Sequence, residues 1–205
     1  MPTMPWTSKI LRQFRQIPYN PSEADFRGPY NKLLYSLFPG DTDYTVFPRY
    51  EPGSYESPTA RFLFDILYDD KPVFILEHRA PQYFQCGSER DDADLKLRQR
   101  IEYLRRKSSS IFGAYWQYQL PSTPIAECPL PVFHAVSAFG TRLCFYRMHH
   151  DQEIQPPFIC DSESATLRVT GLAPQKGWDC DILKEEGEKR FKSTIEEIKQ
   201  ACAAL

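Results

Sequence analysis

Apolar residues recur at helical spacing in three parts of the chain. The first part covers residues 23–38, and Asp25, three residues after Ser22, predicts a capping box at its start. The second part covers about residues 91–108, with acids leading and bases trailing, which suits the helix dipole. The third part covers about residues 182–203. We therefore expect three amphipathic helices.

Runs of β-branched and aromatic residues predict strands between these helices. Residues 61–68 and 73–77 flank a polar turn and predict a hairpin. Residues 132–147 predict a second hairpin, and residues 40–60 predict a short strand with loops. Because hairpins alternate with helices, we expect an α/β fold with a mixed central β-sheet flanked by helices.

Composition is that of an ordinary globular protein and favours a single domain over the 205 residues. Prolines concentrate in a predicted leader over residues 1–21 and in a predicted connector over residues 120–131. The 25 basic and 27 acidic residues give a net charge of −2, so any contact with nucleic acid needs a local basic patch.

The chain carries no sign of export or of membrane insertion. Its first residues lack the apolar core of a signal peptide, and no run of apolar residues is long enough to span a bilayer. The six cysteines show no C-x-x-C spacing, which favours reduced thiols over a metal site or a disulfide framework. We expect an intracellular protein without a membrane partner, and the sequence leaves the oligomeric state open.

One group of charged residues stands inside the first predicted hairpin. Asp65 lies in an otherwise apolar strand, where a carboxylate is costly to bury without a cation, either a side chain or a metal. In the next strand, alternation places Glu77 and Arg79 on one face and His78 on the other. The pattern predicts that two acids and a guanidinium meet at one end of the sheet.

This arrangement resembles the PD-(D/E)XK nuclease superfamily, which has the restriction-endonuclease-like fold. The signature of that family is an acid in one strand of a hairpin and an acid-x-lysine triplet in the next. Asp65 matches the first acid, and Glu77-His78-Arg79 matches the triplet with arginine in place of lysine. The order of the predicted helices and strands agrees with the family as well.

Other parts of the chain extend the resemblance. Glu23 matches an acid that the family often places on its first helix, and Gln99 with Tyr103 matches a glutamine–tyrosine pair of some members. More closely, the chain resembles uncharacterised proteins of mushroom-forming fungi to which this fold is assigned. The resembling segments span nearly the whole chain: SEADFRGPYNKLLYSLFPGD, FLFDILYDDKPVFILEHRAP, HAVSAFGTRLCFYR and WDCDILKEEGEKRF.

The resemblance implies metal-dependent cleavage of nucleic-acid phosphodiester bonds. Asp65 and Glu77, helped by Glu23, would hold Mg²⁺ or Mn²⁺, and the metal would activate water. Arg79 would contact the scissile phosphate, and Gln99 would support the catalytic site.

Arginine in place of the family lysine leaves a second interpretation open. Arginine stays protonated and is poorly suited to proton transfer. Arg79 could instead pair with Glu77 or Asp65 and take the place of the metal. The chain would then be a catalytically inactive nuclease-fold protein that binds nucleic acid or another protein.

Several of these residues also have a purely structural interpretation. The bases Arg98, Arg105 and Arg106 of the helix over 91–108 are candidate nucleic-acid contacts, although such a helix face is often only solvated. Gln99 can be an ordinary helix residue, and Glu23 can serve the start of the first helix through its dipole.

Overall fold

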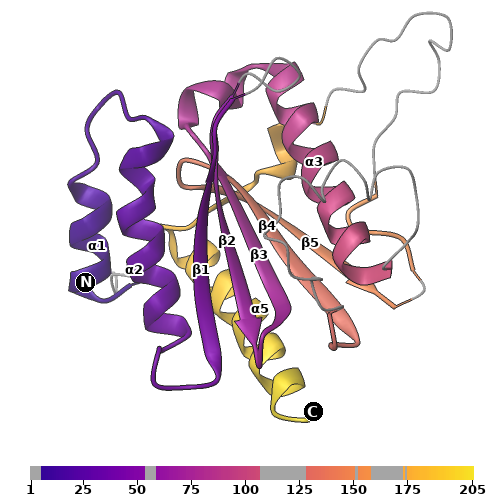
Figure 1. Ribbon diagram of the computed structural model, residues 1–205. Helices are drawn as coiled ribbons and strands as arrows, with labels where there is room; N and C mark the ends of the chain where they lie inside the picture. The colour runs from indigo at the N-terminus through magenta and orange to yellow at the C-terminus, as the bar shows by residue number, and fades with distance from the viewer. Residues whose placement is uncertain (1–5, 54–58, 107–127, 151, 158–172, 174) are drawn as a thin grey trace, which may run out of the picture.

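A computed structural model shows how these elements are arranged (Figure 1). It describes residues 6–53, 59–106, 128–150, 152–157, 173 and 175–205. Most of the predicted connector over 120–131 lies outside these residues.

Six strands form one mixed sheet whose spatial order follows the chain. All neighbouring strands are antiparallel except the third and fourth, which are parallel. A helix, α3 (Gly87–Arg106), lies between these two in the chain, as a parallel connection requires. The mixed α/β class is therefore confirmed. The strands are β1 (Tyr44–Glu51), β2 (Arg61–Tyr68), β3 (Lys71–Arg79), β4 (Val132–Phe139), β5 (Arg142–His149) and β6 (Cys180–Asp181).

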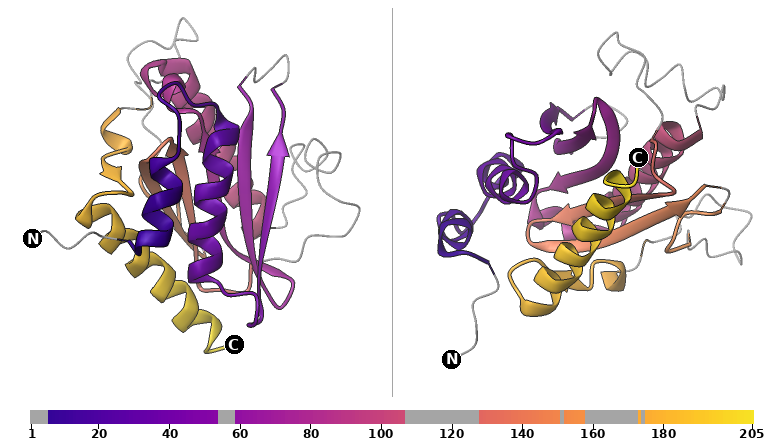
Figure 2. Two further views of the ribbon diagram at one scale, coloured as in Figure 1. Left: turned by 90° about the vertical axis from the view of Figure 1, so that its left-hand side faces the viewer. Right: turned by 90° about the horizontal axis from the view of Figure 1, so that it is seen from below.

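Helices cover both faces of the sheet (Figure 2). One face carries α2 (Arg27–Leu37) and α5 (Glu185–Cys202), and the opposite face carries α3. The predicted helix over 23–38 is confirmed as a 3₁₀-helix, η1 (Glu23–Phe26), that continues into α2. The predicted capping box is present, since the Ser22 backbone N–H and hydroxyl both donate to Asp25 at 2.8 Å. Two further 3₁₀-helices are η2 (Pro81–Gln85) and η3 (Gln175–Gly177).

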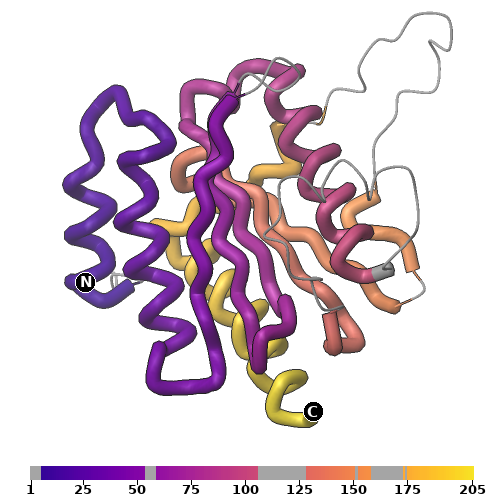
Figure 3. Tube along the Cα trace, viewed as in Figure 1, coloured from indigo at the N-terminus to yellow at the C-terminus, as the bar shows by residue number. Residues whose placement is uncertain are grey.

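The N-terminal segment holds a helix that the sequence analysis did not predict. Within the expected leader, α1 (Ser8–Arg15) runs antiparallel to α2 and packs beside it (Figure 3). Its apolar side chains are buried, and the rings of Phe14 and Tyr30 meet edge to face at 5.5 Å. The prolines of this segment flank the helix and do not interrupt it, which is why proline content was misleading.

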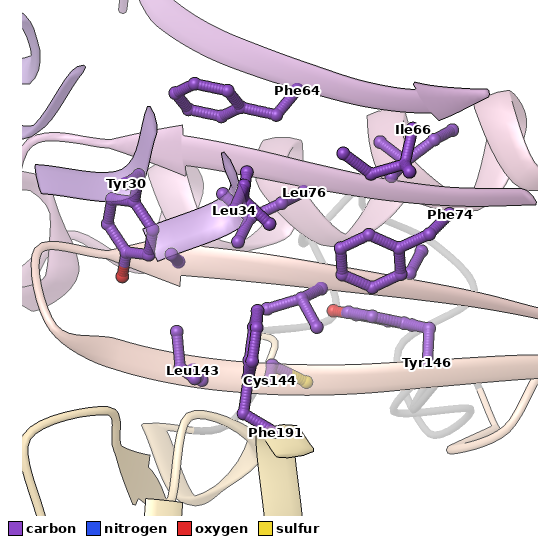
Figure 4. Close-up of a cluster of buried hydrophobic side chains, with 14 of the residues drawn as sticks. Tyr30, Leu34, Phe64, Ile66, Phe74, Leu76, Leu143, Cys144, Tyr146 and Phe191 are labelled. Carbon is purple, nitrogen blue, oxygen red and sulfur yellow. The ribbon is translucent and has the colours of Figure 1, made fainter. Parts of the chain in front are cut away.

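The main apolar core lies between the sheet and the pair α2 and α5 (Figure 4). Tyr30 of α2 approaches Phe64, and Phe191 of α5 approaches Phe74, with ring centroids 6.4 and 6.1 Å apart. This core holds the strands of the sheet in place, and the strands in turn position the charged side chains on the opposite face.

Two other expectations can be compared with the structure. No helix in the described part of the chain is long and apolar enough to cross a membrane. The five cysteines that the structure describes form no disulfide with one another, and four of them are buried.

Candidate functional site

The register of the first hairpin places Asp65 and Glu77 on the same face of the sheet. Glu77 pairs with Leu63 across β2 and β3, and paired residues of antiparallel strands point to the same side. Asp65 lies two residues after Leu63, so its side chain also points to that side. The two carboxylates are therefore diagonal neighbours, as the nuclease resemblance requires, on the face that α3 covers.

Both oxygens of Asp65 are held by arginines. Arg49 of β1 donates through Nε to Oδ2 at 2.9 Å, and Arg100 of α3 donates through Nη2 to Oδ1 and Oδ2, each at 3.0 Å. Side chains of all three residues are almost buried, so the pairing supplies the cation that a carboxylate in an apolar strand needs.

Glu77 is held by Arg79 at the end of the same strand. The guanidinium donates through Nε to Glu77 Oε1 at 3.0 Å, and its Nη2 lies 2.8 Å from Asp92 Oδ2 on α3. A third carboxylate, Glu89, lies 3.5 Å from Nη1. Arg79 is fully buried, so its charge is neutralised by these acids and not by solvent.

Two further residues extend this group towards the sheet edge. Arg61 of β2 donates through Nε to Glu51 Oε2 of β1 at 2.7 Å. Burial alone would lower the pKa of Arg61, but the carboxylates of Glu77 and Glu51 raise it above its ordinary value. We call the whole group the arginine–carboxylate network. It comprises Arg49, Glu51, Arg61, Asp65, Glu77, Arg79, Glu89, Asp92 and Arg100.

The network does not suit a divalent metal. Mg²⁺ needs oxygen ligands and keeps several of its waters, whereas the oxygens of Asp65 already accept N–H groups from two arginines. A dication would also meet the positive charges of neighbouring guanidinium groups. In the described ranges no three His, Cys, Asp or Glu side chains are gathered as metal ligands would be.

Protonation does not free Asp65 for a metal at neutral pH. Burial raises the pKa of Asp65 to about 6, while the charge and hydrogen bond of Arg49 act in the opposite direction. Above that pH the carboxylate is ionised and remains the partner of Arg49 and Arg100.

Two predicted supporting residues lie apart from the carboxylate pair. Glu23 belongs to η1, which packs through Phe26 on His78, on the opposite face of the sheet. Gln99 is half-buried on α3, but the side chain that reaches Asp65 comes from its neighbour Arg100.

Two of the three predicted nucleic-acid contacts on α3 lie in the interior instead of on an open surface. Arg98 is buried, donates to Asp94 at 2.8 Å and to the Pro156 carbonyl at 2.7 Å. Arg105 is also buried and donates to backbone carbonyls, including that of Pro131 at 3.0 Å. The side chain of Arg106 lies outside the described part of the structure.

None of Arg49, Arg61 and Arg100 was predicted as a site residue, although Arg61 and Arg100 each carry a signal in the sequence. Arg100 lies on the apolar stripe of α3, three residues after Leu97 and four before Leu104, where an unpaired cation would be costly. Arg61 shares the face of Asp65 by alternation along β2, whereas Arg49 joins that face only through the pairing of β1 with β2, which alternation within one strand cannot reveal.

Comparison with known protein families, with characterised proteins and with solved structures finds no match for this chain.

Proposed function

We propose that this chain is a catalytically inactive member of the nuclease-like group that it resembles, with a restriction-endonuclease-like fold that binds nucleic acid or another protein. Support for the fold comes from the antiparallel β1–β2–β3 meander followed by α3 and a parallel β4. Support for inactivity comes from the pairing of Asp65 with Arg49 and Arg100, because those N–H groups take the oxygens that a metal would need.

A metal-dependent nuclease is the second candidate. It is favoured by one observation, the placement of Asp65 and Glu77 as diagonal neighbours on one face beside Arg79. In that reading Asp65 and Glu77 would hold Mg²⁺ or Mn²⁺, and the pairs with Arg49 and Arg100 would have to open first.

Calorimetric titration with Mn²⁺ and Mg²⁺ separates the two candidates. We expect no saturable heat from the wild-type chain, and no cleavage of single- or double-stranded DNA or RNA in Mn²⁺. Saturable heat that disappears in Asp65→Asn but persists in Asp41→Asn, an exposed acid, would establish the nuclease instead. Trace cleavage that rises in Arg79→Lys would identify an impaired enzyme.

A further inference from the structure

The helices α1 and α2 carry positive charge without any acid. Three bases in α1 and two in α2 give five positive charges and no negative charge, in a chain whose net charge is −2. The nearest acids in the chain, Glu23 and Asp25, lie in η1, where Asp25 is bonded to Ser22. This side of the molecule is therefore locally basic, and it faces the viewer in the left view of Figure 2.

A groove of about 420 Å³ lies between these two helices. It is lined by three cations, two amides, one tyrosine and one glycine: Lys9, Arg12, Gln13, Gly28, Asn31, Lys32 and Tyr35. Among the described residues, none of Lys9, Arg12 and Lys32 forms an ion pair. Like charges gathered in a hollow focus a positive potential and attract anions.

Helix α5 shows that such charges are paired elsewhere on the surface. Lys189 lies 2.7 Å from Glu185, and Lys192 contacts Glu188, each one turn away. A larger cavity of about 750 Å³ beside β5 also contains paired groups, including Arg98 with Asp94. Other exposed cations, such as Lys71 and Lys184, also form no ion pair among the described residues, so the groove is distinguished by the gathering of three such cations in one hollow.

The groove also holds an acceptor that lacks a donor. Asn31 Oδ1 is buried, and no described residue donates a hydrogen bond to it. Leaving a buried acceptor unpaired is unfavourable, so a ligand hydroxyl or amino group would be stabilised if the Asn31 side chain turned its Oδ1 towards the groove. The ring of Tyr35, 44% exposed, adds a face on which a base can stack.

We propose that the α1–α2 groove binds a phosphorylated ligand with a hydrogen-bond donor beside its phosphate, which is the chemistry of a nucleotide. Lys9, Arg12 and Lys32 hold the phosphate through charge-assisted hydrogen bonds. Asn31 accepts from the adjacent hydroxyl or amino group. The groove lies outside the arginine–carboxylate network and does not depend on whether that network is catalytic.

Adenosine monophosphate, adenosine and inorganic phosphate test this proposal by NMR titration of the labelled protein. We expect adenosine monophosphate to shift amide resonances of α1 and α2, adenosine alone to shift none, and phosphate to bind more weakly than the nucleotide. A short single-stranded oligonucleotide tests whether the groove prefers a nucleotide that is part of a strand. If it does, the oligonucleotide should bind more tightly than adenosine monophosphate.

Two variants address the groove by different physical means. Lys9→Glu with Lys32→Glu reverses the charge, and Gly28→Leu fills the groove, since only Gln13 Oε1, at 3.9 Å, lies within 4 Å of an added Cβ. Each should weaken nucleotide binding about tenfold or more, while both should leave the fold intact. Asn31→Leu should weaken nucleotide binding but leave phosphate binding unchanged.

The matched control is Lys71→Glu with Lys184→Glu, which makes the same charge change at exposed positions outside the groove. We expect its affinity to stay within about twofold of wild type. The proposal is wrong if the control weakens binding as much as Lys9→Glu with Lys32→Glu, or if the nucleotide shifts no resonance of α1 or α2. Cleavage of the oligonucleotide in Mn²⁺ would contradict the proposed function and leave this inference standing.

Discussion

At the scale of single residues, His78 shows that the strand face on which a side chain lies determines its protonation state. It lies between Glu77 and Arg79 in the chain but points to the opposite side, where its ring packs on Phe26 and Tyr30 at centroid distances of 4.6 and 5.3 Å. Both ring nitrogens are buried, and neither has a hydrogen-bond partner in the described ranges. Burial lowers the pKa of His78 to about 3.

This lowered pKa makes stability depend on pH. An unfolded histidine titrates near 6.5, so the neutral ring of His78 favours the folded state above that pH, and this stability is lost as the pH falls towards 3. Asp65, whose pKa is raised to about 6, acts in the opposite direction, because its protonation favours the folded state at low pH. The contribution of His78 must therefore be measured as a difference between variants.

We predict that His78→Phe becomes progressively more stable than wild type as the pH falls from 6.5 towards 3. The difference in unfolding free energy should change by up to about 1.4 kcal/mol per pH unit, the value for one proton. Urea denaturation at several pH values measures it, with the exposed His150→Gln as control. Parallel curves for wild type and His78→Phe would show that the ring is hydrated in the folded state.

At the scale of elements, the join between β6 and α5 depends on a residue without a side chain. Gly187 lies in the first turn of α5, and a Cβ added there would overlap with the Asp181 carbonyl oxygen. Backbone at that position cannot be displaced without moving the helix. The helix therefore approaches the end of the sheet only because position 187 is glycine.

We predict that Gly187→Ala destabilises the protein by about 2 kcal/mol or more, although alanine is the better helix former. Gly40→Ala is the matched control, because nothing lies within 4 Å of a Cβ at that position. Thermal unfolding compares the two variants. Equal stability of Gly187→Ala and wild type would mean that α5 shifts away from β6 at little cost.

At the scale of the whole molecule, the arginine–carboxylate network connects strands β1, β2 and β3 to α3. Arg49, Asp65 and Arg100 come from three different elements and meet in one buried group. Buried ion pairs add little net stability over apolar packing, but removing one partner leaves an uncompensated charge. The network thus makes the docking of α3 on the sheet depend on all of its members.

We predict that Asp65→Ala lowers the unfolding free energy by about 3–5 kcal/mol, because Arg49 and Arg100 both lose their partner. Asp41→Ala, at an exposed position, should change it by less than about 0.5 kcal/mol. Arg100→Ala combined with Asp65→Ala should cost less than the sum of the two single changes. Strict additivity would contradict a shared network.

The sequence by itself determined most of the helices and strands, and the placement of Glu77 beside Arg79 on one face of β3. Periodicity located the hairpins and the three longer helices, the Ser22–Asp25 capping box was confirmed, and alternation placed Glu77 with Arg79 and apart from His78. These features depend on residues close together in the chain, whose spacing is fixed by helix and strand geometry.

Only the tertiary structure decided what neutralises Asp65 and what the bases of α3 do. Arg49 and Arg100 reach Asp65 across 16 and 35 residues, and Arg105 binds carbonyls more than 20 residues further on. The helix α1 is part of the apolar core only because its apolar side packs against α2. Such contacts depend on strand register and helix docking, which bring distant residues together and leave no periodic signal in the chain.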